Sequence, residues 1–125
     1  MHAIKFNYLY RDGGNYKKWA HVIFSNPTGL TPEAATEALK GVLLQDGLFI
    51  AHQIRIPEAF LFEQGNATSD DHCFHEFVSF EASLETPNDS CSRSITQFIA
   101  DVRSEAKRGW VAFDPHDVIR QQLSD

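Results

Sequence analysis

The segment 69–77, SDDHCFHEF, contains a dense group of side chains that could perform chemistry. On a β-strand, side chains alternate between the two faces, so Asp71, Cys73 and His75 share one side. All three are residue types that bind zinc and other transition metals. Because zinc sites need three or four convergent ligands, a further ligand would come from elsewhere in the chain. The histidines that could supply it are His21, His52 and His116.

The same residues also fit a structural interpretation. His72 and His75 would point to opposite faces of a strand, which does not suit an H-x-x-H metal pair. On a helix, Asp71 and His75 would be four residues apart and could chelate an ion. The pair His72 and Glu76 has the same spacing, but the aromatic and β-branched residues that follow favour a strand. With no second cluster of ligand types, we favour a polar strand end. We expect no cofactor, with a divalent metal as the alternative.

The stretch 8–19, YLYRDGGNYKKW, interleaves aromatic residues with Arg11, Lys17 and Lys18. Aromatic side chains beside cations are typical of surfaces that stack on single-stranded nucleic acid. They are equally typical of a twisted two-stranded hairpin, where they form cross-strand pairs. Residues 1–26 carry +3, which leaves −9 on the other residues of a chain whose net charge is −6. An acidic chain binds nucleic acid poorly, so the hairpin is the favoured interpretation.

The charge pattern predicts self-association. The segment 56–92 holds eight acidic residues and no Lys or Arg, whereas the hairpin 5–18 is basic. These regions could attract each other within one fold or between two copies. A two-fold dimer would use the pairing twice, and an unpaired sheet edge would favour such an assembly. We therefore predict a homodimer, and an additional protein partner is compatible with the same pattern.

The elements that must position these residues are predicted from periodicity and end signals. Alternation predicts strands over 3–11 and 48–56, and strand-like composition predicts strands over 20–25 and 72–82, with a short further strand over 58–63. Helical spacing and capping residues predict helices over 31–47, 94–108 and 113–123; Thr31 caps the first, which has Pro32 at its first position. The order β-β-α-β-(β)-β-α-α predicts a single α+β domain, 1–125. Its mostly antiparallel sheet of four to five strands carries two main helices and a short C-terminal helix.

Composition excludes several classes of protein. With 125 residues, 42% of them hydrophobic and 12% aromatic, the chain can build one folded core. No apolar run approaches the roughly 20 residues of a membrane span. Lys5, Arg11 and Asp12 interrupt the N-terminal stretch where a signal peptide would be apolar. We therefore expect no membrane association, a cytoplasmic location, and free thiols at Cys73 and Cys91.

The runs YRDGGNYK, VIFSNP, LLQDGLF and DHCFHEF together resemble a group of small bacterial proteins without an assigned function. The resemblance covers most of residues 6 to 80 and implies a stand-alone bacterial domain. It also marks polar residues as a candidate ligand or partner surface. These are Arg11, Asp12, Asn15, Tyr16, Asp71, His72, His75 and Glu76.

The sequence contains no complete catalytic set, and no catalytic residue is identified. We predict a non-enzymatic, self-associating interaction domain of bacterial origin. The alternatives are a metal-dependent hydrolase or nuclease using the cluster 71–76, and a weak nucleic-acid-binding domain using the hairpin 8–19.

Overall fold

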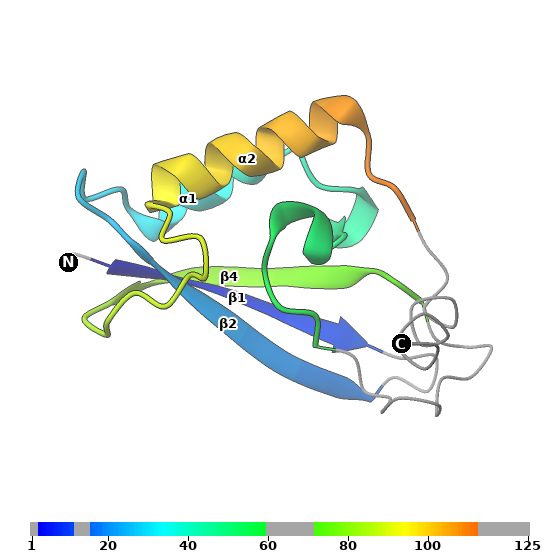
Figure 1. Ribbon diagram of the computed structural model, residues 1–125, viewed down its shortest axis with the longest axis horizontal. Helices are drawn as coiled ribbons and strands as arrows, with labels where there is room; N and C mark the ends of the chain where they lie inside the picture. The colour runs from blue at the N-terminus through cyan, green and yellow to red at the C-terminus, as the bar shows by residue number, and fades with distance from the viewer. Residues whose placement is uncertain (1–2, 12–15, 60–71, 113–125) are drawn as a thin grey trace.

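The computed structural model describes residues 3–11, 16–59 and 72–112. Four antiparallel strands form one sheet in the order β2-β1-β4-β3. Both helices lie on one face of this sheet, as Figure 1 shows. In the described part of the chain, none of the helices is long and apolar enough to cross a membrane. The strands are β1 (Ala3–Arg11), β2 (Lys17–Ser25), β3 (Leu48–Phe49) and β4 (His75–Ser83), and the helices are α1 (Pro32–Leu39) and α2 (Ile95–Arg108).

Strand β1 lies in the centre and follows the predicted alternation. Ile4, Phe6, Tyr8 and Tyr10 are fully or almost fully buried, and the first three of them belong to the core beneath the helices. The pairing of β1 with β4 shifts between Asn7 and Tyr8. The shift leaves Val78 without an opposite residue, as in a β-bulge. As a result Phe77 and Phe80 both pack on Phe6, with ring centroids 5.5 and 5.4 Å away.

Helix α2 forms as predicted. Ser94 and Gln97 make a reciprocal capping box at its N-terminus, with bonds of 3.3 and 2.9 Å. Its predicted apolar stripe is buried, apart from Ala106, which is half-buried. The buried residues of the stripe are Ile95, Phe98, Ile99 and Val102.

Helix α1 begins where predicted but ends eight residues early. Thr31 accepts a hydrogen bond from the Ala34 amide at 3.1 Å, as a helix N-cap should. After Leu39 the backbone of Lys40 is extended and Gly41 has φ of 74°, a left-handed conformation in which the helix cannot continue. The prediction of a helix to residue 47 is therefore wrong beyond residue 39. Val42 and Leu43 pack on the core from the turn instead, so their spacing imitated a helical stripe.

The predicted strand 48–56 is wrong after its second residue. Only Leu48 and Phe49 pair with β4, and a 3-10 turn follows at His52–Ile54. Apolar side chains of this segment are buried on both sides of the turn, so their alternation does not mark one sheet face. His52, one of the histidines that could have supplied a further metal ligand, is exposed. Of the predicted strand 58–63, Glu58 and Ala59 have no regular structure. The rest of it and the predicted helix 113–123 lie outside the described residues.

A buried arginine fixes the loop between β4 and α2. Arg93 grips Asp89 through two side-chain bonds of 2.9 and 3.0 Å. Its remaining donors reach the carbonyls of Ile54 and Arg55 and the carboxylate of Asp101, at 2.9, 3.1 and 3.2 Å. Burial opposes ionisation of Asp89, but the hydrogen bonds and charge of Arg93 outweigh it and lower the pKa of this carboxyl. The guanidinium also lies over the rings of Phe24 and Phe98.

Candidate functional site

His75, the first residue of β4, is completely buried. Its Nε2 accepts a hydrogen bond of 2.8 Å from the Ala59 amide, so the lone pair is on Nε2 and the neutral ring carries its proton on Nδ1. Burial lowers the pKa of His75 to about 4, which keeps the ring neutral at physiological pH. The ring lies among three aromatic side chains, Tyr8, Tyr10 and Phe49. His75 thus holds the segment around Ala59 against the sheet.

His72 has a structural role at the same end of the sheet. Its Nδ1 accepts a bond from the Phe74 amide at 3.0 Å, and its Nε2 donates to the Arg11 carbonyl at 2.7 Å. Its own amide donates to the Tyr10 hydroxyl at 3.1 Å. Both ring nitrogens are therefore engaged in tying the start of β4 to the end of β1.

The structure describes two of the three predicted metal ligands. Asp71 lies outside the described residues, while Cys73 and His75 are both buried. Over the ranges 3–11, 16–59 and 72–112, no group of three or more His, Cys, Asp and Glu side chains could hold a metal ion. Coordination through Nε2 of His75 would cost the bond to Ala59. The set Asp71, Cys73 and His75 stays a prediction.

The predicted partner surface divides between described and undescribed residues. Asp12 and Asn15 lie outside the described ranges. Arg11 binds Glu76 on the sheet face away from the helices, with bonds of 3.4 and 3.2 Å. Tyr16 is 73% exposed. The structure therefore brings Arg11, Glu76 and His72 to one end of the sheet, but in contacts that stabilise the fold.

The charge complementarity predicted from the sequence is partly used within one chain. Lys5 binds Glu85 at 2.7 Å, and this hydrogen bond raises the pKa of Lys5 and lowers that of Glu85. Arg11 binds Glu76 in the same way. Of the hairpin cations, Lys17 and Lys18 remain exposed, and neither forms an ion pair with another described residue.

The aromatic residues of the hairpin also divide into two groups. Tyr8 and Tyr10 are completely buried and cannot stack on a base. The Tyr8 hydroxyl donates to the Pro57 carbonyl at 2.6 Å, and burial raises the pKa of Tyr8. Trp19, on β2, is 62% exposed. Tyr16, which directly precedes β2, is still more exposed. The stacking surface suggested by the sequence is thus reduced from four aromatic residues to two.

Strand β2 forms one edge of the sheet, and the residues that the structure describes cover only part of this edge. The Ile23 amide donates to Oδ1 of Asn88 at 2.8 Å, and the Asn88 amide donates to the Ile23 carbonyl at 2.9 Å. Ser25 bridges to Ser94 a little further along. Because both backbone groups of Ile23 bind this loop, they point away from β1. The loop therefore occupies the edge at the C-terminal end of β2.

The same row of backbone groups continues toward the N-terminus of β2. The β1–β2 register runs without a shift from Ala3 opposite Ser25 to Arg11 opposite Lys17. In an antiparallel pair, alternate residues direct their N–H and C=O groups to the same side. Lys17, Trp19 and His21 therefore present theirs to the outside, as Ile23 does. No described residue outside the strand forms a backbone hydrogen bond with them. We call these outward backbone groups of Lys17, Trp19 and His21 the open edge.

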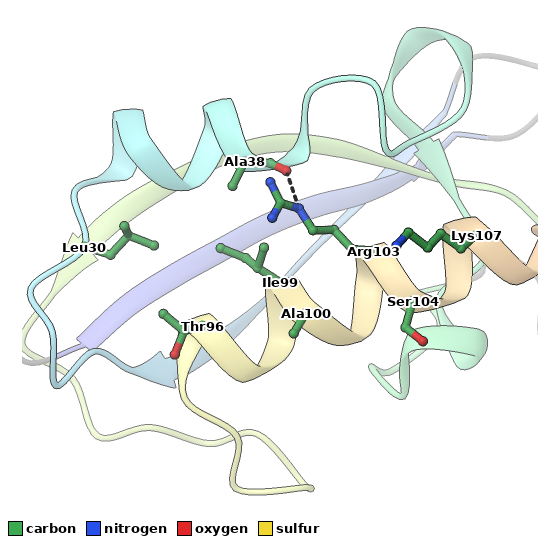
Figure 2. Close-up of a pocket in the computed structure, with 8 residues that line it drawn as sticks. All are labelled: Leu30, Ala38, Thr96, Ile99, Ala100, Arg103, Ser104 and Lys107. Atoms are coloured by element: carbon green, nitrogen blue, oxygen red, sulfur yellow. Dashed lines mark hydrogen bonds between the residues drawn. The ribbon is translucent and has the colours of Figure 1, made fainter.

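A groove of about 520 Å³ separates α1 from α2. Figure 2 shows Arg103 reaching from α2 across this groove to the Ala38 carbonyl, at 3.3 Å. That carbonyl belongs to the last turn of α1, where a cation offsets the negative end of the helix dipole. Lys107 lies one turn further along α2. The groove floor is apolar but small. The cation that crosses it, Arg103, is already bound to α1.

Two functional features escaped the sequence prediction. Asn88 and Arg93 lie in a polar loop, and nothing in its composition separates a residue that pairs with a strand or binds a buried acid from a solvated one. Only the alternation of β2 could have indicated which backbone groups face outward.

Compared with known proteins, the chain matches no family model, no curated protein and no solved structure, so its function is inferred from the geometry described above.

Proposed function

We propose that the protein is a non-enzymatic interaction domain that binds an extended segment of a partner protein as an additional strand on β2. The observation that carries this proposal is the unequal covering of one strand edge. Asn88 already uses the outward groups of Ile23, and the same row continues through the open edge. Extended peptides bind such edges through main-chain hydrogen bonds, and side-chain contacts supply specificity.

The side chains beside the open edge support an interface. Trp19 belongs to the open edge itself, and Tyr16 directly precedes the strand; both are largely exposed. Large aromatic residues are enriched at protein interfaces and often dominate their binding energy. The two neighbouring lysines, Lys17 and Lys18, are exposed as well.

The non-enzymatic part of the proposal is supported by the contacts of the polar residues. His72 and His75, the best acid–base candidates, hold backbone groups in place. Glu76 holds Arg11. A catalytic base must reach a substrate proton, and these groups instead bind the fold itself.

Self-association is the part of the prediction that the structure supports least. Lys5 and Arg11, which the charge argument offered to a second copy, bind Glu85 and Glu76 of their own chain. The homodimer stays a prediction. Light scattering at micromolar concentration should give about twice the 14.1 kDa chain mass if it forms, and a monomer at both low and high salt would refute it.

The binding mode is tested by selecting peptides from a random displayed library on the full chain. Replacing His21 by Pro removes an outward N–H that β1 does not use, and proline is tolerated at such edge positions. The matched control, His21→Ala, removes the same side chain but keeps the N–H. We expect selected peptides to bind wild type and His21→Ala alike, and His21→Pro about tenfold more weakly or worse. Equal binding to the proline variant would contradict the proposal. So would NMR spectra in which a selected peptide shifts only amide signals outside β2.

A further inference from the structure

We infer that the partner segment is acidic and that its acids follow an aromatic or β-branched residue. This inference rests on the proposed function and specifies the chemistry of the partner. Lys17 and Lys18 are consecutive residues of a strand, so their side chains point to opposite sheet faces. A strand added to β2 would extend the sheet and have side chains on both faces, so it could contact both cations.

The positions of the acids follow from antiparallel pairing. Residues directly opposite each other share a face and interact, and opposite charges stabilise such a pair. Acidic residues therefore fit opposite Lys17 and Lys18. An aromatic or β-branched residue fits opposite Trp19. Read from its N-terminus, the partner segment has two unrestricted positions, one aromatic or β-branched residue, and then two acids.

The chain's own loop on this edge contains acidic residues, but their partners are already within the chain. The residue bound at Ile23 is Asn88, which is followed directly by Asp89 and lies three residues after Glu85. Glu85 binds Lys5, and Asp89 binds Arg93. These neighbouring acids are thus already paired, whereas Lys17 and Lys18 have no ion-pair partner within the described ranges.

A second copy of β2 fits the open edge less well. A two-fold pairing centred on Trp19 would set Lys17 opposite His21 and Lys18 opposite Ala20. It would gather the lysines of both chains in one short strand pair with no acid between them. Lysines on an edge strand are a common device against pairing of like edges. The geometry therefore favours an acidic partner over self-pairing through β2.

The test uses two synthetic peptides and the isotope-labelled full chain. The first is acetyl-Val-Thr-Phe-Glu-Glu-Thr-amide, and the second has Lys-Lys in place of Glu-Glu. We expect the acidic peptide to shift the amide signals of Lys17, Trp19 and His21, and to bind at least about tenfold more tightly than the basic one at low salt. In the double variant Lys17→Glu, Lys18→Glu, the preference should reverse.

The outcomes separate this inference from the proposed function. If library peptides bind β2 but are not acidic, and the two synthetic peptides bind equally, the acidic pattern is wrong and strand addition stands. If the acidic peptide shifts signals near Arg103 and Lys107 instead, the inference is wrong and strand addition loses its support. No shift with either peptide at millimolar concentration also overturns the acidic pattern. Dilution-dependent shifts at the open edge without peptide would make a second copy the occupant.

Discussion

The start of β4, where His72 and His75 lie (the histidine end), differs from the open edge of β2 in how its polar groups are bonded. At the histidine end, the ring nitrogens of His72 and His75 bind backbone groups of Arg11, Phe74 and Ala59. At the open edge, backbone donors and acceptors face outward beside an exposed Trp19. The histidine ring nitrogens, which suggested chemistry, thus form hydrogen bonds within the fold. The outward backbone groups of the open edge form none with described residues outside the strand. The comparison teaches that availability, rather than residue type, identifies the candidate surface.

The largest effect is expected where the fold has buried a charge. Arg93→Met leaves Asp89, whose side chain is only 2% exposed, without its cation. We expect the free energy of unfolding to fall by about 3–5 kcal/mol, as when one partner of a buried ion pair is removed. Denaturation with urea measures this. Arg103→Met, which removes an exposed arginine bound to one carbonyl, is the control and should cost about 1 kcal/mol or less. Similar losses in both variants would show that the buried Arg93–Asp89 ion pair contributes no more to stability than an exposed arginine contact.

The second effect is a pH dependence of stability at the histidine end. The pKa of His75 is lowered from 6.5 to about 4, so between these values the unfolded chain binds a proton that the folded chain does not. Stability should therefore fall as the pH falls through this window, by about 3 kcal/mol in total. His75→Gln keeps an acceptor but cannot titrate, and should remove this part of the slope. Urea denaturation between pH 7 and 4 measures both proteins. Identical slopes would mean that the pKa of His75 is the same in the folded and the unfolded chain.

A smaller effect is expected from the tyrosine that supports the same end. Tyr8→Phe removes the donor to the Pro57 carbonyl and leaves that acceptor without this bond. A loss of about 1–2 kcal/mol follows from the cost of a lost buried hydrogen bond. Tyr16→Phe is the matched control, because that side chain is largely exposed, and its stability should stay unchanged in thermal unfolding. A neutral Tyr8→Phe would show that water replaces the lost bond.

The smallest effect on stability is expected at the open edge. The double variant Lys17→Glu, Lys18→Glu changes exposed side chains, which form no ion pair with another described residue. Its unfolding free energy should stay within about 0.5 kcal/mol of wild type, as for most surface changes. Urea denaturation under the conditions used for Arg93→Met measures it. A loss above about 2 kcal/mol would make the lysines part of the fold rather than of an interface.

The sequence predicts the parts of the fold that depend on local pattern. Alternation predicted β1, Thr31 was the predicted N-cap of α1, and helical spacing predicted α2. The early end of α1 was less accessible, because Val42 and Leu43 keep helical spacing while they are buried from a turn. Local periodicity cannot separate these two ways of burying apolar residues.

The candidate site was harder to predict because it depends on tertiary position. Alternation placed Cys73 and His75 on one strand side but could not tell whether that side faces the core or solvent. The bulge at Val78 also changes which β4 residues face the helices. The contact of Asn88 with Ile23 joins residues 65 positions apart, so no local pattern reports it.

The most direct test of the central claim is residue-resolved amide hydrogen exchange along β2 in the free protein. The amides of Lys18, Ala20 and Val22 should be protected, because they face β1, and that of Ile23 should be protected by Asn88. The amides of Lys17, Trp19 and His21 should exchange rapidly, which would give an alternating pattern that ends at Ile23. Protection of these three amides comparable to their even-numbered neighbours would show that the edge is already covered, and would contradict the account.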